Sequence, residues 1–207
     1  SSFKAFSFNL VSDIFLLAAF VCFYKVTNTT DCETFIYLSL WDNLLNNVQL
    51  QAGLFFLVIC ASIKSVQLGG HLWLPDSMEA PVPASSLIHS ATLVSAGIFL
   101  LCKFSPLYIA LNWTSYMILL GSLTAAYGGL VSASQTDLKK LLAYSTMSHC
   151  GFLWVLASSG NFFITIFYLF LHGLFKAASF YCAGSFIRNY GSQDSRLMGS
   201  SHIFFRL

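Results

Sequence analysis

The chain has 207 residues, of which 57% are hydrophobic and only 9% are charged, and its formal net charge is +2. Soluble domains carry about 25% charged residues, so this composition is typical of a membrane protein. The small net charge gives no reason to expect a nucleic-acid partner. Because one membrane span needs about 20 apolar residues, the length fits about six spans and leaves no room for a separate soluble domain.

The first expected span runs from about residue 5 to residue 26 and carries Asp13. The polar stretch 27–33 that follows is expected to be a solvated loop. Residues 35–48 then mix leucine, isoleucine and tryptophan with aspartate and asparagine. Since tryptophan and tyrosine favour the membrane interface, this stretch suits a helix on the membrane surface.

The second expected span runs from about residue 50 to residue 68 and carries Lys64 four residues before its end. Gly69 and Gly70 break it. The next stretch, 71–83, holds three of the four prolines, so we expect a short broken helix there. Irregular backbone at membrane depth is tolerated only where protein buries it or where it lines a cavity.

The remaining expected spans follow one another closely and carry most of the other basic residues. They are 85–102 with His89, 107–131 without formal charge, 138–157 with Lys139 and Lys140, and 162–187 with His172 and Lys176. The overall prediction is an all-α, polytopic membrane helix bundle of about six spans with a broken helix.

Lys64, His172 and Lys176 are the strongest candidates for function. A lysine at bilayer depth is costly and normally faces a bundle interior or a water-filled cavity. His172 and Lys176 are four residues apart and therefore share one helix face. Histidine titrates near neutrality and can pass a proton between its two nitrogens. The spacing therefore suits a proton relay.

Four other charged or titratable residues leave two interpretations open. His89 is either a hydrogen-bonded core residue or a relay residue, and Asp13 is either the counter-ion of a buried lysine or a residue near the membrane surface. Lys139 and Lys140 follow the expected N-cap, Thr136 or Asp137. They are explained by positive-inside topology or by a role in the ion path.

Other polar residues are assigned structural roles. Asp76, beside Pro75, is expected to be capping or solvated, Glu79 is undecided, and His149 is expected to be a packed core residue. The six cysteines are scattered singly without a CxxC motif, so they predict free thiols and no metal or cluster site. No nucleotide-binding loop is recognisable.

Four stretches together carry a family resemblance: ASIKSVQ (61–67), WLPDSMEAPVPASSLIHSAT (73–92), QTDLKKLLAYSTMS (135–148) and HGLFKA (172–177). They resemble subunit 5 of NADH dehydrogenase, the distal antiporter-like subunit of respiratory complex I. The resemblance runs from about Lys4 to Gly199. It implies an antiporter-like fold of two inverted repeats, with broken helices at the bilayer midplane.

The resemblance also implies residue roles. According to the resemblance, Lys64 is the lysine of the first broken helix, Asp13 is the acidic partner near the first half-channel, and His89 is the histidine of the next span. His172 and Lys176 form the later relay. Lys139 or Lys140 belongs to the connection between half-channels.

The resemblance is partial. Spans that should precede Ser1 are absent, including the glutamate that pairs with the first lysine, as are a second broken helix and a lateral helix that should follow Leu207. His149 stands where glutamine is expected, and Gly173 where alanine is usual. We therefore expect residues 1–207 to be one transmembrane proton-translocating domain, the central part of a larger subunit that is either split or truncated here.

The implied function is proton translocation within NADH:ubiquinone oxidoreductase, with no redox centre in this chain. NAD, FMN, iron–sulfur clusters and ubiquinone are expected in other subunits, and the partners are other membrane-arm subunits and lipid. The expected location is the mitochondrial inner membrane, with a bacterial or plastid membrane as the alternative. A multisubunit Na⁺/H⁺ antiporter and a non-pumping scaffold are the alternative functions.

Overall fold

A computed structural model describes residues 2–29, 31–39, 47–90 and 92–198. Within these ranges the chain is almost entirely helical, and an isolated bridge between Asp137 and Asp194 is the only β pairing. The predicted all-α class is therefore confirmed.

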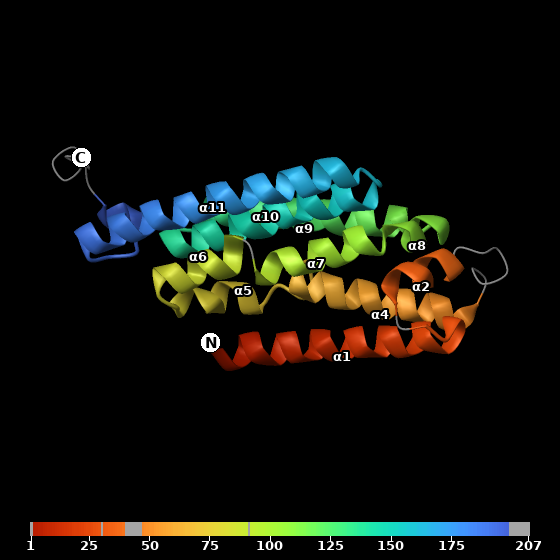
Figure 1. Ribbon diagram of the computed structural model, residues 1–207. Coiled ribbons are helices and arrows are strands. Elements are labelled where there is room, and N and C mark those ends of the chain that lie inside the picture. The colour runs from red at the N-terminus through yellow and green to blue at the C-terminus, as the bar shows by residue number, and fades with distance from the viewer. Residues whose placement is uncertain (1, 30, 40–46, 91, 199–207) are drawn as a thin grey trace.

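The long helices lie side by side along a common direction, with α1 next to α4 at one side and α9, α10 and α11 at the other (Figure 1). Their bounds are α1 Ser2–Thr27, α2 Cys32–Ser39, α4 Val48–Lys64, α5 Trp73–Asp76, the 3-10 turn η1 Ser77–Glu79, α6 Val82–Ser90, α7 Leu93–Lys103, α8 Ser105–Ala110, α9 Thr114–Ser134, α10 Leu138–Ser158, α11 Phe162–Tyr190 and the 3-10 turn η2 Ser195–Leu197.

Four stretches in the described part of the chain are long and apolar enough to cross a membrane: α1, the run Val82–Lys103 that contains α6 and α7, α9, and α11. The apolar helix α4 is shorter, at 17 residues. Helix α10 has 21 residues but is more polar and starts with two lysines. All six predicted segments are thus mainly helical, and four of them meet the requirements for a span by length and composition.

Two of the predicted spans are interrupted in the structure. The expected span 85–102 breaks directly after His89, where α6 ends at Ser90 and Thr92 leaves the helical conformation with φ −111° and ψ −84°. The expected span 107–131 breaks between α8 and α9, where Asn112 adopts a left-handed φ of 59°. Asparagine tolerates this conformation better than other non-glycine residues.

The predicted loop and surface helix are only partly correct. Helix α2 begins at Cys32, inside the stretch 27–33 that the sequence assigns to a loop. It covers the first part of the expected surface helix 35–48, whereas residues 40–46 lie outside the described residues.

Close packing between α9 and α10 depends on Gly128. A Cβ atom on Gly128 would lie 2.7 Å from the backbone nitrogen of Ser148, so no larger residue fits without displacing α10. Small residues at such positions let membrane helices approach closely. The neighbouring Gly129 has room, because its added Cβ would meet nothing closer than 3.7 Å.

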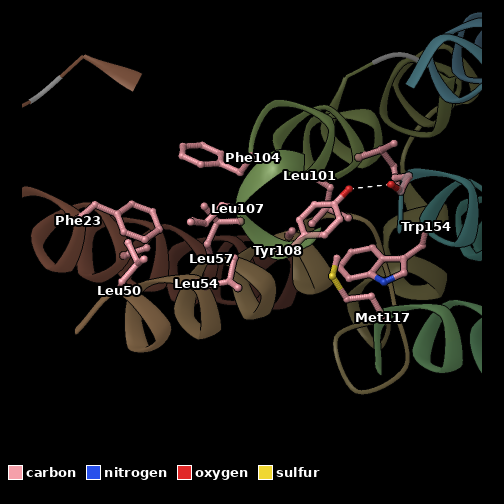
Figure 2. Close-up of a cluster of buried hydrophobic side chains, with 14 of the residues drawn as sticks. Phe23, Leu50, Leu54, Leu57, Leu101, Phe104, Leu107, Tyr108, Met117 and Trp154 are labelled. Carbon is pink, nitrogen blue, oxygen red and sulfur yellow. Dashed lines mark hydrogen bonds between the residues drawn. The ribbon is translucent and has the colours of Figure 1, made fainter. Parts of the chain in front are cut away.

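A hydrophobic cluster joins α1, α4, α7, α8, α9 and α10 (Figure 2). Its fully buried members include Leu54, Leu107 and Trp154. Tyr108 also belongs to it, and its hydroxyl donates a hydrogen bond of 2.7 Å to the carbonyl oxygen of Ala157. A second cluster surrounds the broken segment between α4 and α6, and Trp73 and Phe180 are among its members. The two clusters hold the interrupted helices against α10.

Candidate proton pathway

The first polar group lies between α1 and α4. Lys64 is the last residue of α4, and its Nζ lies 2.7 Å from Oδ1 of Asp13 on α1. A lysine in the last turn also interacts favourably with the negative end of the helix dipole. Of the two interpretations that the sequence left open for Asp13, the structure therefore shows the ion pair with a lysine. The Lys64 side chain is 21% exposed and the Asp13 side chain 58%.

Helix α4 ends at Lys64, and the backbone directly after it is irregular. Val66 takes a left-handed φ of 60°, which is strained for a β-branched residue. Two groups satisfy carbonyls at the free end of α4: the Ser65 hydroxyl donates to the carbonyl of Ala61 at 2.6 Å, and the Trp73 indole nitrogen donates to that of Ile63 at 3.3 Å. The broken segment thereby fixes the end of the helix that carries the lysine.

Gln67, which sequence reasoning did not single out, connects this break to α9 and α10. Its side chain is fully buried. Nε2 donates to the carbonyl of Cys150 on α10 at 3.3 Å, and Oε1 accepts from the Thr124 hydroxyl on α9 at 2.5 Å. Because this buried amide has partners on two other helices, it fixes the C-terminal end of α4, which carries Lys64, relative to α9 and α10.

The second polar group lies between α10 and α11. Lys176 is 3% exposed, and its Nζ donates to the Ser145 hydroxyl at 2.6 Å and lies 3.5 Å from the carbonyl of Leu142. His172 is buried one helical turn away, and its Nε2 has no hydrogen-bond partner among the described residues. The structure shows no salt bridge to Lys176 in the described part of the chain, so the lysine is held by neutral acceptors.

His89 belongs to the same region. It is fully buried near the end of α6, which packs against α11, and its ring stacks on Phe180 with centroids 5.3 Å apart. Its Nδ1 lies 3.5 Å from the Thr146 hydroxyl, and its Nε2 has no partner among the described residues. His89 also lies within electrostatic reach of Lys176 and His172. Imidazole nitrogens without protein partners are available to exchange protons.

Lys139 and Lys140, which the sequence could not separate, have different environments. Lys139 is 6% exposed, and its Nζ donates to the carbonyl of Ala80 at 3.1 Å and lies 3.5 Å from that of Met78. Lys140 is half-exposed and pairs with Asp137 at 3.1 Å. Asp137 occupies the predicted N-cap position of α10 but makes no capping hydrogen bond with its side chain. Of the two lysines, Lys139 is the one directed into the bundle.

Asp76 is solvated, as the sequence suggested, and it pairs with Lys4 at the start of α1 at 2.7 Å. The hydrogen bond from Lys4 and its charge hold the pKa of Asp76 below its ordinary value.

Within the described residues no group of three or more His, Cys, Asp or Glu side chains could hold a metal ion, and all six cysteines are free thiols.

His149 makes a polar contact that sequence reasoning missed. Its Nδ1 lies 2.6 Å from the hydroxyl oxygen of Tyr168 on α11, and its ring centre lies 5.6 Å from that of His172. One feature of the sequence could have pointed to this contact. Tyr168, His172 and Lys176 follow one another at four-residue intervals and therefore lie on one face of α11.

The chain is similar to several known membrane proteins. The family of transmembrane proteins described as NADH:quinone oxidoreductase/Mrp antiporter matches residues 1–202. The chain is 51% identical, over 97% of its length, to NADH-ubiquinone oxidoreductase chain 5 of Paramecium tetraurelia, of which it spans 36%. It is also 38% identical, over 90% of its length, to the chloroplastic NAD(P)H-quinone oxidoreductase subunit 5 of Ipomoea purpurea, of which it spans 27%.

A solved structure, the Mrp complex from a Dietzia species, contains a chain with the same fold. It superposes with a TM-score of 0.81 and 31% identity, over 89% of this chain and 21% of that one. This confirms the antiporter-like architecture, and the relative is part of a membrane complex. The match to residues 1–202 and the shared fold together establish that the chain is a multi-pass membrane protein of the NADH:quinone oxidoreductase/Mrp antiporter family.

Proposed function

We propose that this chain translocates protons as the central part of an antiporter-like subunit of NADH:ubiquinone oxidoreductase in the mitochondrial inner membrane. The observation that carries the proposal is Lys176, which is buried without a carboxylate partner among the described residues and lies one turn from His172. A buried lysine whose partners are a hydroxyl, a carbonyl and an aromatic ring, all of them neutral, is costly to keep charged, so it is suited to take up and release a proton.

The 51% identity to chain 5 of the Paramecium NADH-ubiquinone oxidoreductase supports this assembly and this location. The chain spans about a third of that relative, and the rest of the transport path belongs to segments or chains outside it. NAD, FMN, iron–sulfur clusters and ubiquinone belong to other subunits in this proposal. The other membrane-arm subunits and the surrounding lipid are the partners.

The relay begins at Lys64, which Asp13 holds at 2.7 Å, and continues through His89, His172 and Lys176. Lys139 links the α10 start to the broken segment that precedes His89. Moving one charge against 100 mV requires about 2.3 kcal/mol. A shift of about two pKa units at a buried lysine is of that size, since one unit corresponds to about 1.4 kcal/mol.

The test is Lys176→Ala in the complete complex, reconstituted into liposomes, with NADH oxidation and proton uptake measured together. We expect assembly and NADH oxidation to remain and proton uptake per NADH to fall. The matched control is Lys103→Ala, which removes an exposed lysine at the end of α7. Unchanged proton uptake per NADH in Lys176→Ala would contradict the proposal.

Exchange of Na⁺ for H⁺ is the second candidate, because the Mrp complex shares the fold at 31% identity. The two functions differ in their dependence on sodium. Proton uptake that needs NADH and is unaffected by removing sodium supports the oxidoreductase, and proton movement that follows an imposed sodium gradient without NADH supports the antiporter.

A further inference from the structure

We infer that His149 and Tyr168 form an additional proton-carrying pair, which extends the relay from His172 toward the N-terminal end of α11. This inference rests on the proposed proton transport. Sequence reasoning assigned His149 to core packing.

The pair is one end of a polar ladder between two antiparallel helices. On α11, Tyr168, His172 and Lys176 follow one another at four-residue spacing and therefore lie on one face. On α10, Ser145 and His149 have the same spacing. Ser145 contacts Lys176, and His149 contacts both Tyr168 and His172. The ladder thus places five side chains that can donate or accept a proton along one interface between α10 and α11.

Aromatic neighbours fix the rings of the ladder. Phe175 packs edge-on against His149, with centroids 5.2 Å apart, and against His172, with centroids 5.3 Å apart. Phe152 also packs edge-on against His149, with centroids 6.5 Å apart. These contacts hold His149 in a position where one nitrogen faces the Tyr168 hydroxyl at 2.6 Å. A proton-transfer pair needs this kind of fixed geometry.

Transfer through the pair balances without a cofactor. In one direction, a hydronium ion gives a proton to the Tyr168 oxygen as the Tyr168 O–H bond breaks, and the released proton binds Nδ1 of His149. The imidazolium then releases its Nε2 proton to His172, whose buried Nε2 has no other partner among the described residues. The ring centres of His149 and His172 lie 5.6 Å apart. In the net step one proton moves from the hydronium ion to His172, which becomes an imidazolium. Tyr168 and His149 are neutral again, and the ring proton of His149 has moved from Nε2 to Nδ1.

The experiment compares two substitutions of Tyr168 in the complete complex in liposomes. Tyr168→Phe keeps the ring and removes the hydroxyl, whereas Tyr168→His restores a proton carrier in a different shape. Tyr181→Phe is the matched control, because Tyr181 lies on the same helix and is 64% exposed. Loss of a positioned proton carrier slows transfer by about 100-fold or more.

We therefore expect Tyr168→Phe to lower proton uptake per NADH to the level of Lys176→Ala, and Tyr168→His to retain most of it. A packing role predicts the opposite order, because phenylalanine is the closer replacement in shape. Full proton uptake in Tyr168→Phe, or a Tyr168→His variant no better than Tyr168→Phe, would overturn the inference while leaving the proposed function intact. Full uptake in Lys176→Ala, measured in parallel, would instead remove the proposed function itself.

Discussion

Replacing Gln67 by alanine should destabilise the protein more than any exposed substitution on the same segment. The change removes two interhelical hydrogen bonds, one to the carbonyl of Cys150 at 3.3 Å and one from the hydroxyl of Thr124 at 2.5 Å. Each is worth about 0.5–1.5 kcal/mol net, and the lost buried methylene adds about 0.8 kcal/mol. The expected loss is therefore about 2–4 kcal/mol in the free energy of unfolding.

The assay is denaturant titration of the detergent-solubilised complex, with release of this chain as the signal. Gln51→Ala is the matched control, because Gln51 is exposed on α4 and should change stability by less than about 0.5 kcal/mol. A double-mutant cycle with Thr124→Ala should give a coupling energy of at least about 0.5 kcal/mol. If Gln67→Ala behaves like Gln51→Ala, the amide does not tie the break after Lys64 to α9 and α10.

Three further predictions concern other contacts of the fold. Gly128→Ala should lower the free energy of unfolding by about 1–3 kcal/mol, because the added methyl group overpacks α9 against α10. Gly129→Ala should be neutral or stabilising. Equal denaturation midpoints for the two variants would contradict this difference. Lys139→Met should speed amide hydrogen exchange in η1 and α6 by lowering the local opening free energy about 1 kcal/mol, and the exposed control Lys140→Met should not. Lys4 lowers the pKa of Asp76, so the native chain should be more stable than Asp76→Asn at neutral pH. This difference in stability should vanish as the pH falls through the lowered pKa of Asp76. A difference in stability that does not depend on pH would rule out the pairing.

The sequence was informative about which charged residues are energetically costly to place in a membrane. A charged residue in an apolar run is expensive wherever it lies, and the runs around Lys64 and Lys176 could therefore be recognised without a structure. Helical spacing placed His172 and Lys176 on one face, and the structure places both in the same buried group. The composition and the apolar runs also predicted the all-α membrane fold.

What the sequence could not provide was partners across the bundle. Ser145 as the acceptor for Lys176, and Cys150 and Thr124 as the partners of Gln67, come from helices distant in sequence. No local pattern encodes such pairs, because they depend on how α9, α10 and α11 pack. The same limit explains why Lys139 and Lys140 could not be told apart, since one residue of helical rotation decides which lysine faces the bundle.

The interruptions at residue 92 and at residues 111–113 were missed for a local reason. Hydropathy averages over a window, and Thr92 and Asn112 lie in stretches that are apolar on both sides. The left-handed backbone of Asn112 and the irregular backbone of Thr92 have little effect on such an average. A helix break in an apolar run is visible to sequence reasoning mainly when glycine or proline marks it, as Gly69 and Gly70 do after Lys64.

The most direct test of the account is the number of protons taken up per NADH oxidised when the buried basic residues are removed together. The measurement uses the complete complex in liposomes with Lys64, His172 and Lys176 all replaced by alanine. The account predicts that NADH oxidation continues while proton uptake per NADH falls below that of the native complex. An unchanged ratio in a fully assembled complex would contradict proton transport by this chain and would favour a scaffold that only holds the membrane arm together.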